Sequence, residues 1–204
     1  TAHVYSSDLS GNIVESSETT NSHPYAKTHL MAEKHILNFN EKDKQDGIIF
    51  RLSNSFGYPV NFDVGCWKLF VNDICKSGIE NRQLVIKSSK NETRNFLPID
   101  ELCRISNYFI DLKISGLKNN IFNIGGKKSY TLLSFAKIIK KEFNKTLSFD
   151  PKIICRKSLD CNNKIKFKYS VDKLRKTGYV FGFNNNLEIK KLIKYCDNNF
   201  DLLK

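Results

Sequence analysis

The fold is decided by the stretch Pro24-Tyr-Ala-Lys-Thr-His-Leu-Met-Ala-Glu33 and by the short run Gly47-Ile-Ile-Phe-Arg-Leu52 that follows it. Apolar residues recur at near-helical spacing from Tyr25 to about Phe39, and a proline suits the entrance of a helix. The run 47–52 is short, apolar and preceded by a charged turn, which is typical of a buried parallel strand. Together they predict a helix that leads into a parallel strand, the rhythm of a βαβ unit.

The remaining chain continues this alternation. The segment Thr1 to Tyr5 is typical of the end of a strand, and a polar loop connects it to Pro24. The periodicity then predicts a helix from Cys66 to Ser77, strands at 83–87 and 94–97, a helix after Pro98, a strand at 120–124, a long helix capped by Ser129, and a last helix from Leu187 to Cys196. The order is mixed α/β, without an internal repeat.

Length and composition fit one globular unit. With 204 residues, 40% of them hydrophobic, the chain can form one well-cored domain or a core with a small lobe. It has no run of about 18 uncharged apolar residues, so we expect no membrane span. It has no targeting pattern, so we expect a cytoplasmic location. Because the sequence starts at Thr1 rather than at a methionine, we expect a truncated chain.

The net charge of +12 would suit a polyanionic partner, whose binding requires clustered lysines and arginines. Here the lysines are spread over predicted helix faces and loops, as at Lys137, Lys140, Lys164 and Lys166, among many asparagines. This pattern favours a solvated surface over a nucleic-acid site.

The cysteines and histidines do not have metal-ligand spacing. The six cysteines include no C-x-x-C pair and the four histidines form no H-E-x-x-H motif, so we expect no metal. In a reducing compartment the thiols stay free. We expect Cys103 and Cys196 to lie on apolar helix faces and to behave as small hydrophobic residues.

A tyrosine on a helix can act as the base that takes a sugar hydroxyl proton while hydride leaves the carbon. Its phenol must then ionise about three pH units below its ordinary pKa of about 10, which corresponds to roughly 4 kcal/mol. A cation one helical turn away can supply part of this stabilisation. A Tyr-x-x-x-Lys helix is the common solution, and this chain has Tyr25 and His29 at that spacing.

The ordered segments Thr1-Ala-His-Val-Tyr5, a polar loop and Pro24 to Glu33 resemble the extended short-chain dehydrogenase/reductase family, the NAD-dependent nucleotide-sugar epimerases and dehydratases. The resemblance implies that Thr1 hydrogen-bonds the reacting sugar oxygen and that Tyr25 is the base. His29 takes the position of the lysine that lowers the tyrosine pKa and contacts the nicotinamide ribose.

His29 departs from the family pattern. A histidine has an ordinary pKa near 6.5, is largely neutral at pH 7 and is shorter than a lysine. Lys27 follows Tyr25 by two residues and points to another face of the helix. Two interpretations stay open: an active site adapted to histidine, or a helix in which His29 only packs and catalysis is weak or absent.

Two further segments match the family in order. The segment Arg51-Leu-Ser-Asn-Ser-Phe-Gly-Tyr-Pro59 resembles the strand and loop in which Ser53 approaches the nicotinamide and Asn54 meets the substrate diphosphate. The segment Arg94-Asn-Phe-Leu-Pro-Ile-Asp-Glu-Leu102 resembles the one whose arginine binds that diphosphate. A guanidinium suits this task because its planar fork can bind phosphate bidentately. The alternatives are a turn-forming asparagine and an ordinary surface arginine.

Residues 122–126 and 170–178 also resemble family segments, but Gly125-Gly126 is too sparse for a dinucleotide-binding glycine loop. The resemblance therefore implies the C-terminal part of a Rossmann-like doubly wound parallel sheet with a small mixed α/β substrate-binding lobe. We expect residues 1–57 to form the second half of the core with the catalytic helix. Residues 58–204 should form mostly the lobe, with a returning core strand and helices.

The implied activity is that of an NAD- or NADP-dependent epimerase, dehydratase or reductase acting on a nucleotide-diphosphate sugar. A role in surface-polysaccharide synthesis and a homodimeric full-length protein are expected by family analogy. The alternative is a non-catalytic dinucleotide- or RNA-binding relative that lost the lysine; His29 and the charge of +12 favour it, whereas Thr1 and Tyr25 speak against it.

Overall fold

The computed structural model describes residues 1–6, 9–43, 47–112, 120–157 and 167–200. Its helices are η1 (Ala2–Val4), α1 (Pro24–Asp43), η2 (Gly65–Lys68), α2 (Phe70–Asn81), α3 (Ile99–Asp111), α4 (Leu132–Leu147), α5 (Asp172–Lys176) and α6 (Asn185–Phe200), where η marks a 3-10 helix. Its strands are β1 (Gly11–Ile13), β2 (Ile49–Leu52), β3 (Asn54–Phe56), β4 (Gln83–Ser89), β5 (Thr93–Pro98), β6 (Ile121–Ile124), β7 (Ser129–Thr131), β8 (Lys152–Lys157) and β9 (Phe167–Tyr169). The predicted α/β class is confirmed.

The strands pair mostly in parallel. Strand β2 pairs with β6, β3 with β5, β4 with β8 and β1 with β9, all parallel, and only β5 with β7 is antiparallel among the described strands. None of these parallel partners is adjacent in the chain, because a parallel pair needs a crossover connection. The predicted parallel strand at 47–52 is β2, in register with β6 from Ile49 opposite Ile121 to Leu52 opposite Ile124.

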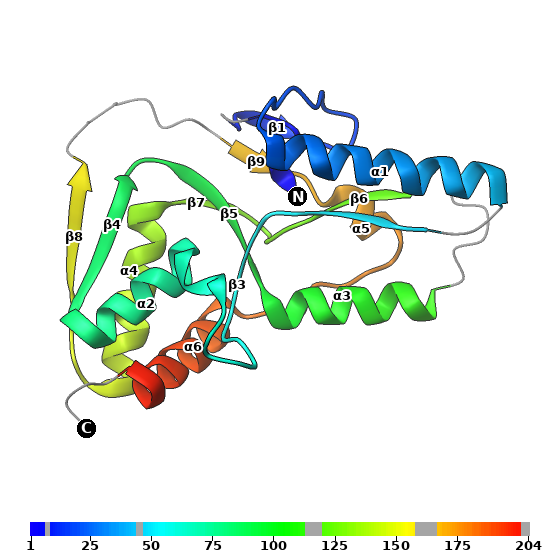
Figure 1. Cartoon of the computed structure of the whole chain (residues 1–204). Coiled ribbons are helices and arrows are strands. Elements are labelled where there is room, and N and C mark those ends of the chain that lie inside the picture. The colour runs from blue at the N-terminus through cyan, green and yellow to red at the C-terminus, as the bar shows by residue number, and fades with distance from the viewer. Residues whose placement is uncertain (7–8, 44–46, 113–119, 158–166, 201–204) are drawn as a thin grey trace.

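Three hydrophobic clusters hold together the elements that Figure 1 draws as ribbons. The largest packs α2, α4 and α6 against β4 and includes Ile74, Leu84 and Phe135. The second packs α3 against β2 and β6. The third joins η1 to β1 and β9, where Val4 and Tyr5 are buried. The division at residue 57 stays a prediction, since Phe56 of β3 belongs to the largest cluster.

Helix α1 is the most weakly embedded of the long helices. Among its residues with described burial, only Ala26 and Glu33 are buried, whereas Met31, Ile36 and Phe39 are exposed. The helix runs along the molecule beside η1 (Figure 1). Its apolar residues follow helical spacing, as predicted, but the described chain covers only a narrow stripe of them.

Two predicted boundaries are wrong at helix starts. Residues 1–5 do not end a strand but form η1, because Thr1 caps the turn by accepting a hydrogen bond from the His3 amide (3.4 Å). Ser129 does not cap α4; it pairs with Asn95 in the β5–β7 ladder. The cap is Thr131, whose Oγ1 accepts from the Ser134 amide (3.1 Å).

Two further predictions need correction. The helix expected from Cys66 to Ser77 is interrupted at Leu69, whose backbone is extended, so η2 and α2 are separate. Cys103 is exposed and not on the apolar face of α3, because Ile105 and Phe109 turn the opposite side of that helix inward. Cys196 is buried as predicted. No helix of the described chain has the length and apolarity to cross a membrane.

Candidate functional site

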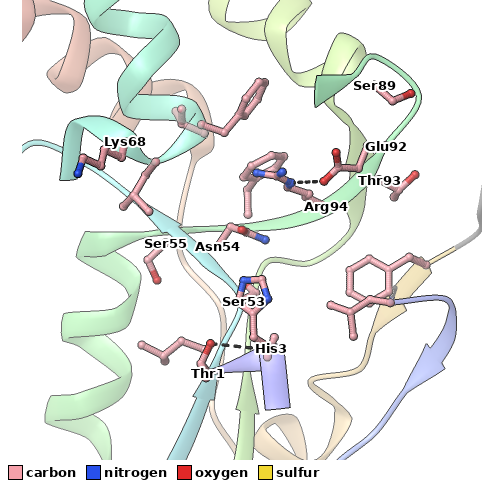
Figure 2. A pocket seen from close by; sticks show the side chains of 18 of the residues that line it. Thr1, His3, Ser53, Asn54, Ser55, Lys68, Ser89, Glu92, Thr93 and Arg94 are labelled. Carbon is pink, nitrogen blue, oxygen red and sulfur yellow. Dashed lines mark hydrogen bonds and ion pairs between the residues drawn. The ribbon is translucent and has the colours of Figure 1, made fainter. Parts of the chain in front are cut away.

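A cavity of about 650 Å³ lies where η1, β3, η2 and β5 meet (Figure 2). Leu52 and Ser53 enter it from the carboxyl end of β2, the usual side for ligands in parallel α/β sheets. Its polar lining comprises Thr1, His3, Ser53, Asn54, Ser55, Lys68, Ser89, Asn91, Glu92, Thr93 and Arg94. The fold therefore gathers four residues predicted separately from three segments: Thr1, Ser53, Asn54 and Arg94.

Thr1 is kept in place because the turn η1 is anchored by hydrogen bonds at Tyr5. The Tyr5 hydroxyl donates to Asn123 Oδ1 (2.6 Å), and the Tyr5 carbonyl accepts from the Thr20 amide (2.7 Å) and the Thr20 hydroxyl (2.9 Å). The Thr1 oxygen accepts one long bond from the His3 amide, and the hydroxyl proton is not used by that bond. The side chain can therefore still donate to a ligand oxygen.

Tyr25 and His29 lie next to each other on α1 but outside the lining of this cavity. Their ring centroids are 4.5 Å apart with an edge contact, as residues four apart on a helix can be. Tyr25 is 50% exposed. Its ring centroid lies 6.3 Å from that of His3, which does line the cavity. Tyr25 thus borders the site through His3.

His3 is a site residue that the sequence analysis missed. Burial lowers the pKa of its imidazole from the ordinary value, and the positive charge of Arg94 lowers it further. A neutral imidazole in a cavity can both donate and accept a hydrogen bond. The sequence offered one indication of this role: His3 follows Thr1 by two residues, and the 3-10 turn places both residues on the cavity side.

The strand segment after β2 supplies small polar groups. The hydroxyl oxygens of Ser53 and Ser55 are buried and find no hydrogen-bond partner among the described residues. Asn54 donates from Nδ2 to the Asn95 carbonyl (3.1 Å), so this nitrogen stabilises the β3–β5 pair. The two serine hydroxyls are the groups here that still need a partner, which a ligand could supply.

Arg94 enters the cavity already paired. Its Nε donates to Glu92 Oε1 (2.7 Å), as drawn in Figure 2, and its guanidinium lies 6.0 Å from the centre of the Phe70 ring. The bond to Nε fixes the plane of the guanidinium and does not use its terminal nitrogens. Lys68, at the end of η2, is a second cation of the lining that the sequence analysis did not single out.

The sequence of residues 1–125 matches the model of the NAD dependent epimerase/dehydratase family. The chain belongs to this family. The matched segment includes all six predicted site residues, and residues beyond 125 lie outside it.

Solved structures of several enzymes share the fold of this family member. A UDP-glucuronic acid 4-epimerase from Bacillus cereus in complex with NAD superposes with a TM-score of 0.75 at 19% identity, over 97% of this chain and 58% of that one. A dTDP-glucose 4,6-dehydratase from Bacillus anthracis in complex with NAD gives 0.71 at 15%, over 98% and 60%. An L-threonine 3-dehydrogenase from Trypanosoma brucei gives 0.74 at 10%, over 96% and 60%.

At these identities the likeness shows the fold alone, and it extends to an enzyme named for an amino acid rather than a nucleotide sugar. The chain spans about 60% of the length of these structures. No curated protein matches the sequence. Within the described part of this epimerase/dehydratase family member, no three His, Cys, Asp or Glu side chains gather as metal ligands.

Proposed function

We propose that the chain is the part of an NAD(P)-dependent enzyme that binds a nucleotide-diphosphate sugar and supplies the acid/base residues. Family membership supports a nicotinamide-dependent epimerase or dehydratase. The observation that carries the proposal is the gathering of Thr1, Ser53, Asn54 and Arg94 in one cavity beside Tyr25. A cavity lined by a hydroxyl, small polar groups and a cation suits a sugar that is joined to a diphosphate.

Tyr25 is the proposed base for the sugar hydroxyl proton, and Thr1 donates a hydrogen bond to the same oxygen. His29, in edge contact with Tyr25, is the proposed partner of the phenol. NAD or NADP, when bound, would supply the acceptor for the hydride of the sugar carbon. The unpaired buried hydroxyls of Ser53 and Ser55 fit a cofactor or ribose group at the end of β2.

Arg94 is the proposed ligand of the diphosphate, with Lys68 as a second cation. The pair Glu92–Arg94 leaves the terminal guanidinium nitrogens available, and these can bind two phosphate oxygens. Asn54 supports the site through its bond to Asn95 and lies in the same lining. A role in surface-polysaccharide synthesis, a cytoplasmic location and a homodimer remain predictions.

The test is turnover of a panel of UDP-, dTDP- and GDP-sugars by the complete protein with NAD and NADP. Tyr25→Phe should abolish turnover while leaving nucleotide-sugar binding within about twofold, because only the proton acceptor is lost. Tyr58→Phe, which alters an exposed tyrosine outside the cavity lining, is the matched control. Full activity of Tyr25→Phe on every accepted sugar would refute the mechanism.

A second candidate is a non-catalytic relative that binds a dinucleotide or RNA. Two observations favour it: His29 stands where the family has a lysine, which is normally charged at pH 7, and Tyr25 lies outside the lining and is half exposed. It takes precedence if the complete protein binds NAD, a nucleotide sugar or RNA without turning over any sugar of the panel.

A further inference from the structure

A buried ion pair connects the helix of Tyr25 to the rest of the fold. Arg51 of β2 is 5% exposed and Glu33 of α1 is 8% exposed. Arg51 donates from Nε to Glu33 Oε1 (3.0 Å) and from Nη2 to Glu33 Oε2 (2.7 Å). This is a two-pronged contact, which fixes both the distance and the relative orientation of the two side chains.

Glu33 is the polar anchor of α1. It and Ala26 are the only buried side chains of this helix among those whose burial is described. Tyr25, His29 and Glu33 are spaced four residues apart and therefore follow one another along one side of the helix. A rotation or shift of α1 at Glu33 is consequently transmitted along the rigid helix to the phenol of Tyr25.

The opposite side of Arg51 contacts the segment of Thr1. Its Nη1 donates to the Glu15 carbonyl (3.2 Å), and its guanidinium lies 4.8 Å from the centre of the Tyr5 ring. Tyr5 ends η1, the turn that begins at Thr1. The Arg51 side chain therefore contacts both α1, which carries the proposed base Tyr25, and η1, the turn that follows Thr1.

The surrounding hydrogen bonds keep Arg51 in place. The Tyr169 hydroxyl donates to the Arg51 carbonyl (2.8 Å), and Asn123 Oδ1 accepts from Tyr5 (2.6 Å). The backbone N–H of Asn123 donates to Glu15 Oε1 (2.9 Å). The backbone of Arg51 is thus tied to β9, and two residues that its guanidinium meets, Tyr5 and Glu15, are tied to β6.

We propose that Arg51 and Glu33 are a positioning pair that sets the separation of Tyr25 from Thr1. The proposal rests on the proposed function, in which these two side chains act on one sugar oxygen. An arginine is needed because a lysine cannot bind both carboxylate oxygens and face the Tyr5 ring with a planar group. Stability alone is a poor explanation, since apolar side chains of similar volume often stabilise as well as a buried ion pair.

The test uses Arg51→Lys and Glu33→Gln in the complete protein, each of which keeps most of the side-chain volume. We expect kcat for the accepted nucleotide sugar to fall at least about tenfold while KM stays within about threefold, because the base is displaced but the diphosphate site is not. Leu192→Ala, in the largest cluster, is the control: it should lower the melting temperature without changing kcat.

Hydrogen exchange supplies a readout that does not need activity. Amides of the first turns of α1 should exchange at least about tenfold faster in both variants than in Leu192→Ala, while those of α2 and α4 stay unchanged. Unchanged exchange in α1 would overturn the proposal even if no sugar were turned over. If Leu192→Ala loses as much kcat as Arg51→Lys and Glu33→Gln when their melting temperatures are equally lowered, the ion pair has only a structural role. If Arg51→Lys does not fold, Glu33→Gln alone decides.

Discussion

Glu188 carries a carboxyl group whose ionisation should make stability depend on pH near neutrality. It lies in the first turn of α6, is 2% exposed, and its Oε1 has no hydrogen-bond partner among the described residues. Its pKa is raised from 4.5 to about 7, chiefly by burial and further by the negative charge of Asp100, with Lys191 partly offsetting both. Asp100 behaves oppositely: its bond to Lys191 lowers its pKa.

The sign follows from the two pKa values. In the unfolded chain the Glu188 carboxyl ionises near 4.5, whereas in the folded chain it keeps its proton up to about 7. The folded state therefore binds more protons between these values, and stability falls as pH rises through this range. The pKa difference corresponds to at most about 3 kcal/mol, so we expect a loss of about 1 to 3 kcal/mol.

The perturbation is Glu188→Gln, which keeps the volume and removes the charge. Urea denaturation of the complete protein at pH 5 and at pH 8 measures the effect. The variant should gain about 1 to 3 kcal/mol over the wild type at pH 8 and little at pH 5. Glu80→Gln, at a partly exposed ion pair with Lys76, is the control and should show no such difference.

The same carboxyl group also packs against the loop that follows β3. A side chain added at Gly57 would place its Cβ 2.9 Å from Glu188 Oε1, so the carboxyl group packs directly against the loop after β3. Ionisation should therefore loosen this loop at alkaline pH. A constant free-energy difference between Glu188→Gln and wild type, within about 0.5 kcal/mol from pH 5 to pH 8, would refute the reasoning.

Three further predictions concern the cavity. Arg94→Ala should weaken nucleotide-sugar binding by at least about 1.5 kcal/mol in calorimetric titration, with NAD affinity nearly unchanged, because only the diphosphate loses a partner. Equal losses for both ligands would indicate a folding defect instead. His29→Ala should reduce turnover several-fold to about a hundredfold, and His29→Lys should exceed the wild type above pH 7, where a lysine stays charged; wild-type rates in both variants would exclude a role for His29. Since the pKa of His3 is lowered, His3→Asn should remove an acid limb that lies below the ordinary histidine range from the kcat/KM profile; an unchanged limb would exclude His3.

Local periodicity was enough to predict most of the elements. The helix from Tyr25 and the strand 47–52 are α1 and β2, because their apolar spacing is imposed by which side of the element is buried. The segment 1–5 was predicted wrongly for a related reason. Val4 and Tyr5 are buried against β9 across a 3-10 turn, and a short apolar run does not distinguish a turn from a strand end.

The site could be predicted in part. Residues four apart on a helix must adjoin, so the contact of Tyr25 with His29 follows from their spacing. The pairing of Arg94 with Glu92 was not accessible in the same way, because Glu92 lies in the loop before β5 and its side chain does not follow the alternation of the strand. The position of Tyr25 outside the cavity lining was not accessible, because it depends on how α1 docks against η1.

Arg51 shows what a closer interpretation of the sequence could have added. The run 47–52 predicts a buried strand, yet it contains an arginine, and a buried guanidinium is costly unless it meets a carboxylate. The preceding helix offers Glu33 on the same side as Tyr25. A charge inside an apolar strand therefore predicts which side of α1 faces the sheet, and with it where the proposed base lies. The bond between Arg51 and Glu33 has the geometry that this argument requires.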